Sequence, residues 1–450
     1  MPLLQTSFLH KITLFLASML LSISAIASNF SETQQKANQG HVEAQFDLAS
    51  MYFEGAGVLQ DEVKAFEWFQ KAANQGDAGA QFILGAMYFK GEGIHQNPAK
   101  AVEWFQKAAN QEIASAQCNL GIMYSNGTGV HQDYAKAVQW YQKAANQGHA
   151  NAQYNLAVMY ANGTGVHQDY AKAVEWFQKA ANQEIASAQY NLGVMYDNGQ
   201  GVRKDDSKAI EWYQKAANQG MASAQYNLGV MYNNGQGIRQ NYAKAVEWYQ
   251  KAANQGDARA QYNLGHMYSK GKGIHQDYAK AIEWYQKAAN QGIASAQYNL
   301  GYMYDEGQGV SQDYDKAAEW YQKAANQGYA SAQYNLALMY SNGTGVPQNY
   351  TKAVEWYQKA ANQGDASAQY NLALMYSNGT GAPQDYAKAV EWYQKAANQG
   401  YASAQYNLAL MYSNGTGVPQ DYAKAVVQAF LRIMLRQWNG IKKLLTKGMV

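Results

Sequence analysis

The chain consists almost entirely of one 36-residue unit, written eleven times in succession without an insertion or a deletion. One copy, 221–256, reads MASAQYNLGVMYNNGQGIRQNYAKAVEWYQKAANQG. A fixed period of about 20 to 50 residues is typical of stacked supersecondary units, each of which contacts mainly its neighbours. The repeat therefore predicts a solenoid over residues 41–426 in place of a globule with one central core. The copies begin at His41, Asp77, Ile113, His149, Ile185, Met221, Asp257, Ile293, Tyr329, Asp365 and Tyr401.

Each unit contains two helical patterns separated by glycine. In the first pattern, Leu228 and Tyr232 recur at the spacing of one helix face. Gly235 and Gly237 are expected to end that helix, because glycine readily adopts the positive φ of a tight turn. The second helix should begin after Asn241, where most copies have Asp. Both side chains carry an oxygen that can accept a hydrogen bond from a free backbone N–H at a helix start.

The second helix is predicted to bury one face that includes Ala245, Trp248 and Ala252. Glu247 and Lys251 lie on the opposite face, in the order that favours an i,i+4 ion pair. The short connections make neighbouring helices antiparallel. The predicted fold class is therefore all-α, an α/α solenoid of eleven helix-turn-helix repeats. The predicted structural core of one repeat is Leu228, Tyr232, Gly235, Ala245, Trp248 and Ala252.

Two small residues inside the first helices also indicate packing. Gly229 costs about 1 kcal/mol relative to Ala in a helix, yet only five of the eleven copies have Ala at this position. Close approach of a neighbour explains a small residue there better than helix formation does. Cys118 is the only cysteine and stands where other copies have Tyr or Phe. It cannot form an internal disulfide, so we expect a small buried hydrophobe.

The N-terminal residues differ from the repeat. Lys11 precedes an apolar stretch from Ile12 to Ile26, and Ala25-Ile26-Ala27 has the small-x-small form of a cleavage site. We expect residues 1–27 to be a secretory signal peptide that is cleaved after Ala27. The mature protein would then be exported to the periplasm or secreted, without membrane insertion. An uncleaved membrane anchor is the alternative.

The two ends of the repeat array also depart from the consensus. Residues 28–40 resemble a second helix of the repeat that has lost its Trp, and they are predicted to be an N-terminal capping half-repeat. The eleventh repeat is incomplete, and residues 427–450 form an aberrant tail. One valid DNA spelling of VPQDYAKAVEW, read one base later, encodes the sequence of residues 430–438. The tail is therefore interpreted as repeat DNA translated out of frame, with a basic amphipathic membrane helix as the alternative.

Composition and repetition exclude several functions. A formal net charge of +2 with 15% charged residues gives no basic surface for nucleic acid. The NGTG turns lack the strand and the Lys-Ser/Thr of a phosphate-binding loop, so no cofactor is expected. Histidines that occur once per repeat cannot converge on one metal ion, so no metal site is expected. These histidines are His95, His131, His167 and His275.

Catalysis requires one singular arrangement of a nucleophile, a base and an oxyanion site. Here the polar residues recur in nearly every copy, which favours a packing rule or a row of binding groups. The sequence therefore predicts no catalytic residues and no enzyme activity.

One asparagine per repeat forms the candidate binding ladder. On a helical wheel Asn227 lies away from Leu228 and near Val230, a position that varies among the copies. An amide offers both a donor and an acceptor, which suits the backbone of an extended peptide. The alternative is a hydrogen bond to a turn of the neighbouring repeat. The ladder comprises Asn119, Asn155, Asn191, Asn227, Asn263, Asn299, Asn335, Asn371 and Asn407.

The repeat resembles the Sel-one-like repeat (SLR), a relative of the tetratricopeptide repeat. The shared pattern is A-x-x-x-L-G-x-x-Y-x-x-G-x-G-V followed by D-x-x-K-A-x-x-W-x-x-K-A-A-x-x-G. The resemblance implies a right-handed superhelix whose first helices line a concave face that binds proteins or peptides. Similar exported bacterial proteins are linked to the cell envelope and to host contact.

Cysteine-rich members of this family are described as weak β-lactamases and have a Cys pair in every repeat, which this chain lacks. We therefore expect a monomeric, non-catalytic scaffold of the SLR type that binds partner proteins or peptides. A β-lactamase-like hydrolase and a passive structural spacer are the alternatives.

Overall fold

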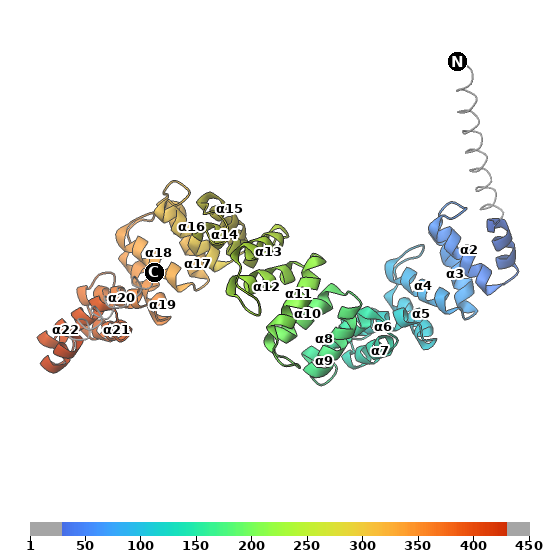
Figure 1. The fold of residues 1–450 in the computed structure, drawn as a ribbon, viewed down its shortest axis with the longest axis horizontal. Helices are drawn as coiled ribbons and strands as arrows, with labels where there is room; N and C mark the ends of the chain where they lie inside the picture. The colour runs from blue at the N-terminus through green and yellow to red at the C-terminus, as the bar shows by residue number, and fades with distance from the viewer. Residues whose placement is uncertain (1–28, 430–450) are drawn as a thin grey trace, which may run out of the picture. The chain divides into compact units, whose positions relative to one another are not determined.

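The computed structural model describes residues 29–429 (Figure 1). These residues fall into two compact units that divide between Met221 and Ala222, just after the first residue of the sixth copy, and each unit is described by itself. Helices make up all of the regular structure, and no strand occurs between residues 29 and 429. The predicted signal peptide, 1–27, and residues 430–450 of the predicted tail lie outside the described residues.

Each unit is a succession of helical hairpins, one hairpin per repeat, and each hairpin packs on the next one within its unit (Figure 1). A helix over residues 29–38 precedes the first hairpin, and a helix over residues 422–429 follows α22. The first unit contains α2 (Val42–Glu54), α3 (Glu62–Asn74), α4 (Ala78–Lys90), α5 (Pro98–Asn110), α6 (Ala114–Asn126), α7 (Tyr134–Asn146), α8 (Ala150–Asn162), α9 (Tyr170–Asn182), α10 (Ala186–Asn198) and α11 (Asp206–Asn218). The second unit contains α12 (Ala222–Asn234), α13 (Tyr242–Asn254), α14 (Ala258–Lys270), α15 (Tyr278–Asn290), α16 (Ala294–Glu306), α17 (Tyr314–Asn326), α18 (Ala330–Asn342), α19 (Tyr350–Asn362), α20 (Ala366–Asn378), α21 (Tyr386–Asn398) and α22 (Ala402–Asn414).

The helix boundaries follow from capping residues. The Asn241 side chain accepts a hydrogen bond from the backbone N–H of Lys244 at 3.0 Å, and Asp277 caps α15 in the same way. This confirms the predicted starts of the second helices. Gly235 and Gly237 have φ values of 70° and 66°, which confirms their expected role in the turn between the helices.

The core is local to each pair of neighbouring repeats. Leu228, Ala245 and Ala252 have no exposed surface, and Tyr232 is buried. Two residues predicted to be in the core differ. Gly235 lies in an exposed turn, where its positive φ and not its burial explains the residue. Trp248 is only half-buried.

Trp248 packs against the core with one part of its ring, while a lysine covers another part. The Lys251 ammonium lies over the Trp248 ring, 4.1 Å from its centroid. The expected ion pair between Glu247 and Lys251 is not formed among the described residues. Desolvated contact with a flat ring competes well with a solvent-exposed ion pair, which contributes little.

Gly229 is close-packed, as expected. A Cβ atom at this position would lie 2.5 Å from the Tyr249 ring of the same repeat. The ring of the second helix therefore occupies the space that a side chain on the first helix would need.

A ladder of buried glutamines holds neighbouring repeats in register. Gln297 donates from Nε2 to the Ala289 carbonyl at 3.1 Å, at the end of the preceding second helix. Its Oε1 accepts a hydrogen bond from Gln327, 30 residues later, at 2.8 Å. The same pairing recurs in every complete repeat of the described chain. Each buried amide is thus satisfied by groups on both sides.

The last glutamine of the ladder lacks its partner. Gln405 Oε1 is buried and has no hydrogen bond within residues 29–429. The position 30 residues later in the sequence is Leu435, which has no amide.

Candidate functional site

The structure places all nine ladder asparagines at half-buried positions on the first helices. In the second unit several of these amides meet tyrosines of the preceding second helix. Asn407 donates from Nδ2 to the Tyr393 hydroxyl at 3.0 Å. Asn263 bonds to Tyr249, and Asn299 bonds to Tyr285. An inter-repeat hydrogen bond therefore exists, as the alternative interpretation expected, although its partner is a phenol and not a turn.

The tyrosine partners are held in their neutral form. Burial raises the pKa of Tyr393 to about 12, and the hydrogen bond with Asn407 lowers it in part. Each such phenol therefore uses one of the two amide donors of its asparagine, while the amide oxygen is left for another partner. In the first unit, Phe177 stands opposite Asn191, and a phenyl ring offers no hydroxyl to the amide.

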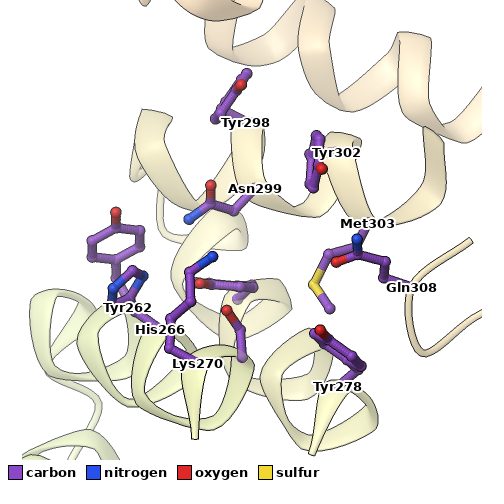
Figure 2. Close-up of a pocket in the computed structure, with 11 residues that line it drawn as sticks. Tyr262, His266, Lys270, Tyr278, Tyr298, Asn299, Tyr302, Met303 and Gln308 are labelled. Atoms are coloured by element: carbon purple, nitrogen blue, oxygen red, sulfur yellow. The ribbon is translucent and has the colours of Figure 1, made fainter. Parts of the chain in front are cut away.

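Three hollows occur at the same register of the repeat. Each is bounded by the first and second helices of one repeat and by the first helix of the next. The hollow between α4, α5 and α6 measures 260 Å³, that between α8, α9 and α10 measures 430 Å³, and that between α14, α15 and α16 measures 380 Å³ (Figure 2). A ladder asparagine lines each one: Asn119, Asn191 and Asn299 respectively.

We define the ladder face as the surface of the first helices that carries the asparagines and the residues equivalent to Val230. The variable Val230 position lines the hollows, as Ile122, Val194 and Tyr302 do. Its large side chains are 38% to 42% exposed in four repeats, so they are accessible to a partner. These four are Ile122, Tyr302, Leu338 and Leu410.

The remaining candidate groups do not form a reactive centre. Cys118 is buried, as expected, and burial raises the pKa of its thiol to about 11, so it is protonated at neutral pH and is a poor nucleophile. His131 lies in an exposed loop, where Nδ1 is 2.9 Å from the Gln132 carbonyl oxygen. Within residues 29–429, no three His, Cys, Asp or Glu side chains are placed to share a metal ion. No helix in this range has the length and apolarity needed to cross a bilayer.

Sequence reasoning missed two features of this site. The tyrosine partners of the asparagines come from a different helix, about 14 residues earlier, so no local pattern reveals them. The charged hollow that contains His266 and Lys270 was also missed. Its signal was present, since both residues depart from an otherwise literal repeat.

Comparison with known proteins identifies the repeat. The Sel1 repeat model matches eleven consecutive segments: 42–77, 78–112, 114–149, 150–184, 186–221, 222–257, 258–293, 294–329, 330–365, 366–401 and 402–427. The chain belongs to the Sel1 repeat family. This confirms the predicted resemblance and the predicted all-α solenoid of eleven repeats. Proteins of the Sel1 repeat family are typically protein-interaction scaffolds and are mainly non-catalytic.

Two solved structures of Sel1 repeat proteins are similar to this chain. One is a protective antigen with an SLR fold from uropathogenic Escherichia coli, with 37% identity, a TM-score of 0.82, and coverage of 91% of this chain and 90% of that one. The other is a Sel1 repeat protein from Oxalobacter formigenes, with 37% identity, a TM-score of 0.55, and coverage of 69% and 89%. None of the curated proteins matches the chain. The handedness, the cap at 28–40 and the ladder's role stay predictions.

Proposed function

We propose that this Sel1 repeat protein is a non-catalytic scaffold that binds partner proteins or peptides along its ladder face. The observation that carries the proposal is the recurrence of hollows at one register, each lined by an asparagine and a variable apolar residue. Exposed apolar side chains also occur elsewhere, as at Leu59 and Val63. The ladder face differs because its exposed apolar side chains and its asparagine amides lie beside the same hollows.

The chemistry of this face suits an extended polypeptide. The exposed apolar side chains can pack on a partner's side chains, and burial of such area is favourable. The asparagine amides can bond to peptide groups of any sequence. Because the same pair recurs in successive repeats of each unit, several residues of one segment could be held at once.

The test is binding of the full chain to an array of short synthetic peptides, followed by two matched variants. Leu338→Lys places a charge on the ladder face and should weaken the selected peptides by about tenfold or more, as burial of an unpaired charge is costly. Glu355→Lys makes a change on the exposed face of α19 and should leave binding unchanged. Equal loss in both variants, or no loss in either, would place binding away from the ladder face.

We also propose export and a monomeric state. Export rests on the composition of residues 1–27, and the similar solved structures are from bacteria. N-terminal sequencing of the protein recovered from the periplasm should begin at Ser28. Light scattering coupled to gel filtration should give the mass of one chain, and a larger mass would contradict the monomer.

A further inference from the structure

The hollow between α14, α15 and α16 differs from its two counterparts in charge. Figure 2 shows His266 and Lys270 on α14 and Asn299 on α16 around the same space. At the positions of His266 and Lys270, the hollow between α8, α9 and α10 has Val158 and Asn162. Two positions that are neutral in that hollow thus carry an imidazole and an ammonium here.

Lys270 lacks the acidic neighbour that its counterpart in another hollow has. In the hollow between α4, α5 and α6, the equivalent Lys90 forms an ion pair with Glu92 at 3.2 Å. The residue equivalent to Glu92 is Lys272, which adds a second positive charge beside Lys270. Within the described residues Lys270 forms no ion pair, and no Asp or Glu is among the residues that line its hollow.

The walls of the hollow are aromatic and polar. Tyr262, Tyr298 and Tyr302 line it, and their rings can cover the methylene groups of a bound side chain. The Tyr285 hydroxyl bonds to Ser269 and Asn299 at the same site. His266 is half-buried, so its ring lies inside the hollow and not on the outer surface.

We propose that this hollow binds the carboxylate of an Asp or Glu side chain in an extended segment of a partner protein. The carboxylate would accept hydrogen bonds from Lys270 Nζ and the His266 ring, and Asn299 would bond to the adjacent peptide group. This inference rests on the proposed function. A polypeptide, and not a free anion, is favoured because the exposed side chains of Tyr302 and Leu338 extend the same face into the next repeats.

One repeat later the charge is reversed. Asp305 and Glu306 stand at the positions of Ser269 and Lys270, and Asp305 accepts a hydrogen bond from the Tyr321 hydroxyl at 3.2 Å. A uniformly acidic partner would therefore be repelled at the next position. The site selects one acidic residue in a defined place and does not attract negative charge in general.

The test uses peptides from the array that bind the full chain, each resynthesised with Glu, Gln or Lys at every position in turn. One position should prefer Glu over Gln by about tenfold to a hundredfold, the range for a hydrogen-bonded charge pair. The double variant His266→Val/Lys270→Asn should abolish this preference, because it should lower the affinity for the Glu peptide more than the affinity for the Gln peptide. The variant residues are those of the hollow between α8, α9 and α10, so the fold should tolerate them, as circular dichroism can verify.

A reciprocal variant keeps the test decisive. Val158→His/Asn162→Lys, added to the first double variant, should restore a Glu preference at the other hollow. If the Glu and Gln versions of every peptide bind the wild-type protein with equal affinity, this inference is overturned and the proposed function remains intact. Absence of binding to any peptide would overturn both. Free glutamate and inorganic phosphate serve as competitors. If either displaces the bound peptide when present at the same concentration as the peptide, the assignment to a polypeptide is overturned.

Discussion

At the scale of single residues, His266 should make peptide binding depend on pH. Burial, Lys270 and Lys272 hold the pKa of His266 below its usual value, and a bound carboxylate would raise it. Binding then takes up a proton, so the affinity for the Glu peptide should increase as the pH falls from about 8 to about 6. The titratable groups that face His266 are Tyr262, Lys270, Lys272, Tyr278, Tyr285, Tyr298 and Tyr302.

The measurement is the peptide dissociation constant as a function of pH. His266→Val should give a nearly flat profile over this range, because the variant has no imidazole at this position. A wild-type profile as flat as that of the variant would show that the imidazole does not contact the ligand.

The aspartate caps give a second prediction at the residue scale. The backbone N–H of a lysine three residues later holds the pKa of Asp133, Asp169, Asp313 and Asp385 below the usual value. Because the folded-state pKa is lowered, the stabilisation is present above the unfolded pKa of about 3.8–3.9 and is lost as the pH falls below it. The quadruple variant with Asn at these caps should lose less stability between pH of about 5 and about 2 than the wild type does.

Asn is a suitable replacement because Asn349 already caps α19 with a hydrogen bond of 2.9 Å. Urea unfolding followed by circular dichroism at each pH gives the free energy of unfolding. Parallel pH profiles for the two proteins would show that the caps do not contribute to acid sensitivity.

At the scale of elements, the two kinds of glycine turn should respond differently to substitution. Gly273 has φ of 70°, and a Cβ atom there would lie 2.3 Å from the Tyr242 carbonyl carbon. Gly292 has φ of 89° but open space around it. Gly292→Ala should cost about 1 kcal/mol for the left-handed backbone, whereas Gly273→Ala should cost about 1–3 kcal/mol more because the backbone must also move.

The chain contains its own control for this comparison. Glu112 and Glu184 occupy the position equivalent to Gly292 with φ of 66° and 64°, so side chains are tolerated there. The measurement is the free energy of unfolding of Gly292→Ala and of Gly273→Ala, each relative to the wild type. Equal losses would mean that backbone conformation alone, and not the contact with Tyr242, keeps Gly273.

At the scale of the whole molecule, removal of one repeat distinguishes two hypotheses: that the solenoid is a binding surface and that it is a passive spacer. Deletion of 329–364 removes α18 and α19 and should leave a folded protein with a smaller urea m-value, because less surface is exposed on unfolding. Deletion of 257–292 should be equally well folded but should also lose the preference for Glu peptides. If both deletions retain the preference, the hollow is not the binding site.

How much the sequence predicted depends on the distance between the groups involved. The cap at Asn241 and the close packing at Gly229 were predictable, because each reflects a local backbone requirement or an obvious limit on size. The partial exposure of Trp248 was not, because the equivalent Trp320 is buried although a lysine lies over its ring in the same way. The charged hollow could not be assembled from sequence, because His266 and Asn299 are on different repeats and only the fold brings them together.

The glutamine ladder bears on how the gene can change. Each buried amide needs a donor 30 residues ahead and a carbonyl eight residues behind, so both partners are set by the period. Unequal recombination that adds or removes a whole number of repeats keeps the distance of 30 residues, so every glutamine still has its hydrogen-bond partner. An insertion or deletion of any other length would leave a buried amide oxygen without a hydrogen bond, as at Gln405 Oε1. Such an unsatisfied acceptor costs about 1–3 kcal/mol. The ladder is therefore compatible with a change in the number of repeats but not with a change in their spacing.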